Sequence, residues 1–392
     1  MIPKFKKHVI ATVDNNIPPY PMNTYLSAGD LNNNGLVDLV VGGRDGKMVW
    51  LENKGNLQFE EHLIDDDVHA VECGGSLYDV SGNGYLDVIV GGGKQIVLWW
   101  WENPGVPDQP WKCHTIYSYD KTGHVHDTLV GDALNTGTPV LITSNQIRPE
   151  PNFTELYLME FPKENLDQPW DFITVGTGFS EALEDPAGEF PKMQPDEGLG
   201  IGDIDGDGLN EIVMGNWWFK QVDGVWQSHK FTNGYITNKI ALADVDGDGV
   251  MEIIVSEGDP VIYGKTQGGR LGWFKPGADI NDLWVEHTLD DGLFDAHTLL
   301  TADFTGNGLP DILCGEIGIA QRETRGYRRR APWILLFENL GGGVFVRHIV
   351  DQGAGIHDGQ LADLTGNGKL DIISKPLHGP HMWHILAFEN LG

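Results

Sequence analysis

The sequence has little cysteine, little positive charge and no long hydrophobic run. Its three cysteines, Cys73, Cys113 and Cys314, are too few and too scattered for a disulfide framework or a zinc cluster. Lys and Arg number 26 against 57 Asp and Glu, so the formal net charge is −31. This balance disfavours nucleic acid as a partner, because phosphate backbones need a basic surface.

No stretch is long enough to span a membrane, and the N-terminal residues lack the apolar core of a signal peptide. We therefore expect a soluble protein that binds no membrane, either cytoplasmic or secreted with its signal peptide removed. Glycine, in contrast, is abundant, with 52 residues. Many tight turns follow from this content, which favours an all-β fold.

One acidic turn recurs along the chain. An Asp is followed by alternating small or acidic residues, then by a Gly and an aliphatic strand. The clear copies begin at Asp30, Asp79, Asp203, Asp244, Asp303 and Asp363, and a degenerate copy begins at Asp132. Repetition of this kind indicates an array or a closed ring of similar units.

Each repeat has the pattern of four short strands. The third strand ends in Glu-Asn in several units, and the fourth has the pattern aromatic-x-x-His-aliphatic. Four strands per repeat favour a β-propeller over a sandwich or barrel. The chain begins with an orphan fourth strand at residues 5–10 and ends after a third strand. We therefore predict one domain over residues 1–392, a seven-bladed β-propeller in which the N-terminal strand completes the last blade.

The acidic turns are candidate calcium sites. Oxygen ligands at turn positions 1, 3, 5 and 9, with Gly at the bend, suit Ca²⁺, which takes six to eight oxygens. Alternatively, the Asp and Asn side chains only cap the turn by hydrogen-bonding its backbone. The predicted structural ligands are Asp203, Asp205, Asp207 and Glu211; Asp244, Asp246, Asp248 and Glu252; and Asp30, Asn32, Asn34 and Asp38.

The acidic turn followed by an aliphatic strand resembles the FG-GAP/VCBS repeats of integrin-type propellers over essentially the whole chain. Residues 101–105, Trp-Glu-Asn-Pro-Gly, followed by Trp111 and His114, and the segment from His287 to Asp303, are similar to the propeller of aldos-2-ulose dehydratase. They are also similar to seven-bladed polysaccharide lyases and to rhamnosidases acting on rhamnosyl-glucuronate. The resemblance implies a carbohydrate-active propeller, but the dehydratase's cupin-like domains are missing here.

Histidines that break the repeat are the candidate catalytic residues. The fourth-strand position recurs and indicates scaffold for His8, His62, His114, His229, His287 and His348. In contrast, His69, His126, His297 and His357 precede acidic turns, where innermost strands enter one mouth of the central channel. Histidine titrates near neutral pH and could transfer protons there. Alternatively, the imidazoles could hold a divalent metal, and Glu72 and Asp127 could orient them or join such a site.

Loops between second and third strands return to the same mouth and carry unusual insertions. Five of the nine arginines fall between positions 322 and 330, which suggests a site for an anionic ligand in a strongly acidic protein. A solvated loop or an oligomer contact is the alternative. The predicted substrate-binding residues are Arg148, Arg322, Arg325, Glu316, His378 and His381, and the further catalytic candidates are Tyr263 and Tyr327.

These features favour a carbohydrate lyase that acts by β-elimination on an anionic oligo- or polysaccharide with a uronate or keto sugar. Such a reaction needs a base, an acid and positive charge near the enolate, which His, His or Tyr, and Arg or a metal could supply. One alternative is a glycoside hydrolase, either histidine-dependent or using Glu257 and Glu316. The other is a propeller that binds carbohydrate or protein without catalysis.

Overall fold

The computed structural model describes residues 3–17, 21–67, 69–147, 153–181, 193–260, 265, 268–317 and 330–392. Every regular element in these ranges is a β-strand. No helix in this part of the chain has the length and apolar character needed to cross a membrane. The all-β prediction is confirmed.

Five sheets contain four antiparallel strands each. One consists of β2 (Asn23–Gly29), β3 (Asp38–Gly43), β4 (Met48–Asn53) and β5 (Phe59–Asp65). The next consists of β14 (Leu199–Gly202), β15 (Glu211–Met214), β16 (Trp217–Val222) and β17 (Val225–Lys230). A third consists of β18 (Asn238–Ala243), β19 (Glu252–Glu257), β20 (Gly269–Lys275) and β21 (Val285–Leu293).

The remaining two four-stranded sheets lie beside each other near the ends of the described chain. One consists of β22 (Ala296–Ala302), β23 (Asp311–Glu316), β24 (Trp333–Asn339) and β25 (Phe345–Gln352). The other consists of β26 (Gln360–Ala362), β27 (Asp371–Ser374), β28 (His384–Asn390) and β1 (Phe5–Thr12). In this last sheet β1 pairs antiparallel with β28, from Phe5 opposite Asn390 to Thr12 opposite His384.

The sixth sheet has eight strands because one long strand belongs to two halves. Its strands are β6 (Ser76–Tyr78), β7 (Asp87–Gly91), β8 (Gln95–Glu102), β9 (Lys112–Gly131), β10 (Val140–Ile147), β11 (Phe153–Glu160), β12 (Ile173–Glu181) and β13 (Met193–Pro195). Residues 112–122 of β9 pair with β8, and residues 123–131 pair with β10. The strand thus forms the outer edge of one four-stranded half and the inner edge of the next.

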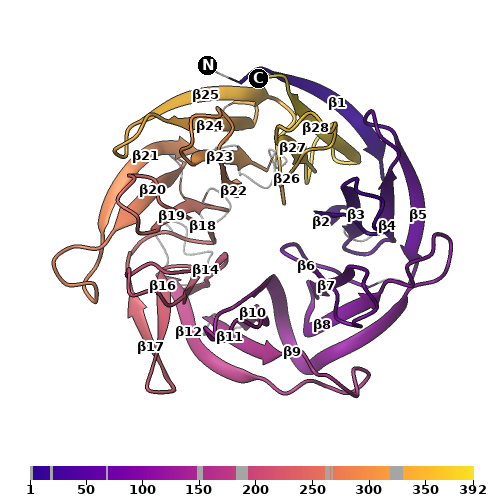
Figure 1. Ribbon diagram of the computed structural model, residues 1–392, viewed down its shortest axis with the longest axis horizontal. Coiled ribbons are helices and arrows are strands. Elements are labelled where there is room, and N and C mark those ends of the chain that lie inside the picture. Colours follow the sequence, from indigo (N-terminus) through magenta and orange to yellow (C-terminus); the bar gives the residue numbers. More distant parts are fainter. Residues whose placement is uncertain are drawn as a thin grey trace.

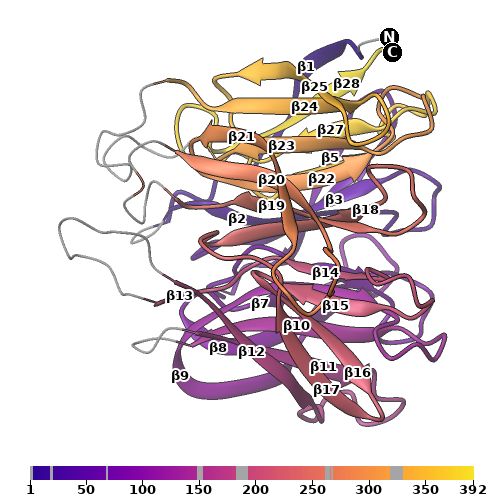
Figure 2. The same cartoon turned by 90° about the vertical axis from the view of Figure 1, so that its left-hand side faces the viewer.

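The sheets are arranged around a common centre, with β2, β6, β14, β18, β22 and β26 innermost (Figure 1). Figure 2 shows the same arrangement from the side, with β1 and β28 next to each other. The hydrophobic cores lie between neighbouring sheets. In one of them, Leu26 and Leu39 pack with Ile373 and Ile385 of the sheet that contains β1. The architecture is that of a β-propeller.

The acidic turns are closed by their own side chains. Asp30, at the first position of its turn, accepts hydrogen bonds from the backbone N–H groups of Asn34 (3.0 Å) and Gly35 (2.8 Å). Asp38, at the ninth position, is fully buried and accepts from the N–H groups of Leu31 (3.0 Å) and Asn53 (2.8 Å). This turn is therefore fastened to the third strand of its own sheet, and Asp87, Asp311 and Asp371 make the same contact in their repeats.

Candidate functional site

The acidic turns fix the position of a ring of buried side chains. Six positions before the first Asp of each turn, every repeat places a residue at the entry of its innermost strand. These residues are Thr24, Cys73, His126, Glu197, Asn238, His297 and His357, and all of them are buried. We call this set the entry ring. Three of the four predicted catalytic histidines belong to it.

Irregular strand pairing helps to place two of these histidines. In the pairing of β9 with β10, Asp127 lies opposite Ser144 and Val125 opposite Asn145, so His126 is skipped. His297 is skipped in the same way between Ala296 and Thr298 of β22. An extra residue of this kind bends the strand and redirects a side chain, which is why such bulges are frequent beside active sites.

Glu197 lies where the cationic and imidazole groups converge. Its Oε2 atom is 3.4 Å from His126 Nε2, 3.6 Å from His297 Nε2 and 3.1 Å from Lys239 Nζ. Its Oε1 atom accepts a 3.0 Å hydrogen bond from Gln146 Nε2. A carboxylate this deeply buried needs compensating positive charge, and Lys239 provides it.

His126 is surrounded by acceptors. Its Nδ1 atom lies 2.9 Å from Asp127 Oδ2, and its Nε2 atom lies 3.3 Å from Cys73 Sγ. Burial lowers the pKa of His126, but Cys73, Glu197 and Asp127 outweigh it and raise the pKa well above its ordinary value. These acceptors therefore favour the protonated form of His126.

His297 has the opposite electrostatic environment. Its ring stacks on that of His357 with centroids 4.3 Å apart, and it lies 5.9 Å from the ring of His126. Burial, followed by the positive charges of Lys239 and His126, holds the pKa of His297 well below its ordinary value. The pKa values of two imidazoles within one cluster are thus displaced in opposite directions, an arrangement that separates an acid from a base.

A buried lysine supports the stacked pair from the adjacent strand end. Lys375 is fully buried, donates to the carbonyl oxygen of Asn23 (2.9 Å) and lies 3.1 Å from His357 Nδ1. Burial lowers the pKa of Lys375 to about 8. Burial, followed by the Lys375 charge, also holds the pKa of His357 well below its ordinary value. His357 is therefore neutral and is fixed by its hydrogen bond to Lys375.

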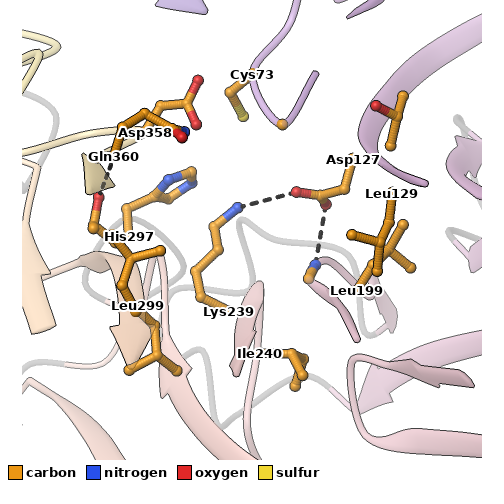
Figure 3. A pocket seen from close by; sticks show the side chains of 16 residues that line it. Cys73, Asp127, Leu129, Leu199, Lys239, Ile240, His297, Leu299, Asp358 and Gln360 are labelled. Carbon is orange, nitrogen blue, oxygen red and sulfur yellow. Dashed lines mark hydrogen bonds and ion pairs between the residues drawn. The ribbon is translucent and has the colours of Figure 1, made fainter. Parts of the chain in front are cut away.

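A cavity of about 160 Å³ opens beside this cluster within the centre of the ring. Figure 3 shows its polar end, where Lys239 extends toward Asp127, with His297, Asp358 and Cys73 around it. The other end is lined by aliphatic side chains, among them Leu129 and Leu199. The cavity thus combines a charged, hydrogen-bonding end with an apolar floor.

His69 lies apart from the entry ring, ten positions before its turn instead of six. Its ring packs edge-on against Trp99 and Trp101, with centroids 5.0 and 5.4 Å away, and its Nε2 atom lies 3.4 Å from Asp65 Oδ2. Of the four predicted histidines, the structure therefore brings together His126, His297 and His357 and leaves His69 elsewhere.

The other described candidates lie in separate local contacts. Glu316 accepts from both guanidinium nitrogens of Arg330, at 2.6 and 2.7 Å, and from the backbone N–H groups of Phe294 and Trp333. His381 Nδ1 lies 3.1 Å from His384 Nδ1, and His378 is half-buried in the preceding turn. The candidates outside the described residues are Arg148, Tyr263, Arg322, Arg325 and Tyr327.

The fourth-strand histidines make the contacts expected of scaffold. His62 lies 2.8 Å from Glu52, and His348 lies 2.7 Å from Glu338. His229 and His287 instead stack on tryptophans of the third strand. These contacts recur along the outside of the ring, away from the cavity.

Sequence reasoning missed several residues of the cluster. Cys73 and Glu197 occupy the same repeat position as His126, but neither is a histidine, so a search for that residue type passed over them. Lys239 follows the ring position of its own repeat directly. Counting six positions back from every turn would have found Cys73 and Glu197. Lys375, from a second strand, has no such signal.

Comparison with known proteins supports the repeat and the fold. The family model described as FG-GAP-like repeat matches residues 203–255 and 303–374. Two crystal structures of BBS1N in complex with ARL6DN, soaked with mercury and with lead, each align with a TM-score of 0.53. The identities are 9% and 10%, over 98% and 97% of this chain and 96% of each matched chain. Comparison with curated proteins gives no match.

The chain is thus a β-propeller that carries FG-GAP-like repeats. At these identities the structural likeness concerns the fold alone. What the central cluster does has to be argued from its own residues.

Proposed function

We propose that the propeller has seven blades. The eight-stranded sheet then counts as two blades that share β9, and β1 completes the blade formed by β26, β27 and β28. The entry ring supports this count, because each acidic turn is preceded, six positions earlier, by one buried residue of the ring. The site would be assembled from one side chain of every blade.

For this seven-bladed propeller we propose the function of a lyase that cleaves a uronate- or keto-sugar-containing carbohydrate by β-elimination. The observation that carries the proposal is the pair His126 and His297, which lie in one cluster with pKa values displaced in opposite directions. Elimination needs a protonated acid and a neutral base at the same pH, and such displacement supplies both.

Each role follows from the local contacts. Neutral His297 would remove the proton from the carbon next to the carboxylate or ketone. Protonated His126, held by Asp127, would donate its proton to the departing glycosidic oxygen. Lys239, whose pKa the charges of Asp127 and Glu197 raise despite its burial, would stabilise the negative charge of the enolate. The carbon–hydrogen and carbon–oxygen bonds break and a carbon–carbon double bond forms. One proton passes from the sugar to His297, and another passes from His126 to the leaving oxygen.

The size of the cavity points to a terminal sugar. Pockets that enclose a whole drug-sized ligand measure about 300–1,000 Å³, and this cavity measures about 160 Å³. We infer that only the end of an anionic oligosaccharide enters the centre of the ring. The remainder would lie at the mouth, where the arginine-rich insertions with Arg148, Arg322 and Arg325 are predicted to bind it.

A divalent metal at the same cluster is the competing arrangement. His126 Nε2, His297 Nε2 and Glu197 Oε2 lie within 4.8 Å of one another, as ligands of one ion would. A bound metal would supply the charge stabilisation, and the two histidines would be ligands. Lys239 Nζ, 3.1 Å from Glu197 Oε2, already provides a cation at this position and favours the metal-free arrangement.

The test is to incubate the protein with rhamnosyl-glucuronate and other uronate glycans and to follow the absorbance of an unsaturated uronate. We expect product formation that EDTA leaves unchanged. His297→Ala and His126→Ala should each reduce kcat by roughly 10²- to 10⁴-fold, the usual contribution of a positioned acid or base. His69→Ala is the matched control, and its turnover should stay at the wild-type level.

Each other outcome has a definite meaning. Released sugar without new absorbance indicates a glycoside hydrolase, and loss of turnover on EDTA treatment indicates the metal arrangement. No turnover on a broad uronate panel would favour a binding propeller; the structure with a similar fold is one of BBS1N in complex with ARL6DN. Wild-type turnover in His297→Ala would contradict the assignment of the base.

The proposal also predicts the pH dependence of catalysis. Activity needs His297 neutral, so it should fall only when the pH drops below a pKa well under the ordinary imidazole value. Activity also needs His126 protonated, so the alkaline limb should lie well above that value. A pH profile of kcat with a broad plateau through neutrality is expected. A single transition near the ordinary pKa of histidine would contradict the assignment.

A further inference from the structure

The two acidic turns richest in carboxylates face a different residue from all the others. In each repeat, the residue at turn position 10 pairs with a residue of the third strand. The next residue along that third strand is a Glu in five repeats and a Lys in two. These residues are Glu52, Glu102, Glu160, Lys220, Lys275, Glu338 and Glu389. Lys occurs only opposite the turns with Asp at positions 3 and 5 and Glu at position 9.

In the first of these turns, Lys220 of β16 places its ammonium among the predicted calcium ligands. Lys220 Nζ contacts Asp205 Oδ2, lies 2.6 Å from Asp207 Oδ2 and lies 3.5 Å from Glu211 Oε1. An ammonium group has three N–H donors, and three carboxylates surround this one. The carboxylate of Asp203 is engaged separately, by the N–H groups of Gly206 (2.7 Å) and Gly208 (2.9 Å).

The second turn repeats the arrangement with a residue from another sheet. Lys275 Nζ of β20 contacts Asp246 Oδ2, lies 2.6 Å from Asp248 Oδ2 and lies 3.8 Å from Glu252 Oε1. Asp244 accepts from Gly247 and Gly249 at 2.7 and 2.9 Å. Two independent repeats therefore show the same match between an acidic turn and a lysine.

The glutamate repeats show what this position does elsewhere. At the Asp30 turn, Glu52 accepts a 3.1 Å hydrogen bond from Asn32 Nδ2 and contacts His62 of the fourth strand. That turn has Asn at positions 3 and 5 and therefore less negative charge to balance. The charge of the third-strand residue thus follows the charge of the turn, as expected if the two form one electrostatic unit.

We propose that the ammonium groups of Lys220 and Lys275 occupy the cation position of the Asp203 and Asp244 turns, so these two turns fold without calcium. A calcium ion bound to the same carboxylates would lie about 2.3–2.6 Å from their oxygens, within a few ångströms of the ammonium that contacts them, and the two cations would repel each other. Structural calcium remains our proposal for the Asp30 turn alone. This inference is independent of the proposed catalytic function.

The test removes each lysine and counts calcium. Calcium binding to the full chain is measured by isothermal titration for the wild type, Asp207→Asn, Asp248→Asn, Lys220→Met and Lys275→Met. We expect Asp207→Asn and Asp248→Asn to bind as many ions as the wild type. Each Lys→Met variant should gain one site, and calcium should raise its Tm more than that of the wild type.

Lys112→Met is the matched control, because Lys112 makes an exposed ion pair with Asp167. Its calcium count and its calcium response should equal those of the wild type. Loss of one bound ion in Asp207→Asn or Asp248→Asn would overturn the proposal, because the wild-type turns would then hold calcium. A Lys→Met variant that folds and gains no site would also overturn it. If a Lys→Met variant fails to fold, the two Asp→Asn variants still decide the question.

Discussion

At the scale of single residues, lysine ammonium groups connect polar groups of neighbouring segments. Lys239 lies between Asp127 and Glu197, Lys220 lies among the carboxylates of an acidic turn, and Lys375 supports His357. Each ammonium is held by oxygen or nitrogen acceptors from a different strand. Lys239 and Lys375 are buried, and a buried charge is tolerated only when its partners are in place, so these two residues require the neighbouring strand ends to keep their positions.

Lys375 gives a pH-dependent prediction. Its pKa is about 8 in the folded protein against 10.5 ordinarily. Between these two values the unfolded chain binds a proton that the folded chain lacks, so the free energy of unfolding should rise with pH. The gain is about 1.4 kcal/mol per pH unit within this window.

Urea unfolding at pH 7.5, 8.5 and 9.5 measures this effect. The rise should be present in the wild type and absent in Lys375→Met. Lys369→Met, a change at an exposed lysine, is the control and should retain the rise. Parallel pH curves for the wild type and Lys375→Met would show that the folded protein does not depress the pKa of Lys375.

How much of the site was predictable also depends on single residues. His126, His297 and His357 were found because the repeat is evident in the sequence and these histidines do not recur at the same position in every unit. His69 was grouped with them by position, although it lies ten positions before its turn instead of six, and the structure places it apart from them. Glu197 and Lys239 were missed because a carboxylate and an amine are common surface residues, and only their burial makes them unusual.

At the scale of elements, the site depends on close approach between neighbouring strands. Gly91, at the end of β7, lies against β9 so closely that a Cβ atom there would be 2.2 Å from the carbonyl oxygen of Val125. Val125 precedes the bulged residue His126 and donates to the carbonyl oxygen of Gly92 at 2.9 Å. The absence of a side chain at Gly91 therefore allows β9 to place His126 in the entry ring.

Gly91→Ala should lower the free energy of unfolding by about 1–3 kcal/mol, as overpacking of a tight contact does. It should also reduce turnover, because the displaced strand carries His126. Thermal unfolding and the uronate assay measure the two effects. Gly277→Ala is the control, since a Cβ atom at that position would meet open space. Equal Tm values for both variants would contradict the tight approach.

The elements themselves were largely predictable, because turn chemistry and aliphatic strands alternate regularly. The shared strand β9 was not. Its outward half, Lys112–Thr122, continues into the inner half as one strand, although Asp120 and Gly123 lie at the junction. Because Asp and Gly are residue types that mark turns, the sequence favours a break at this point and gives no sign that one strand serves two sheets.

At the scale of the whole molecule, the first strand of the described chain, β1, is hydrogen-bonded to the last strand, β28. β1 pairs with β28 along its length, and Phe5 packs edge-on against Phe304 of the adjacent sheet with ring centroids 6.3 Å apart. Removing residues 1–12 would leave one edge of β28 without a partner strand, because β27 pairs only with the other edge.

This truncation should lower the Tm and cause association that increases with protein concentration. Light scattering and thermal unfolding measure both effects. A synthetic peptide of residues 3–13, added to the truncated protein, should restore the Tm. A truncated chain that stays monomeric with the wild-type Tm would show that the pairing of β1 contributes nothing to stability.

The pairing of β1 with β28 has a consequence for synthesis on the ribosome. The β1 segment emerges well before its partner, because β2 to β27 lie between β1 and β28 in the chain. During this interval β1 is an unpaired strand that must not pair with other nascent chains. Lys6 and Lys7, both exposed, place positive charge on it, and charged side chains on an open strand oppose edge-to-edge association. The charge on β1 therefore disfavours its association with other strands until β28 is available to pair with it.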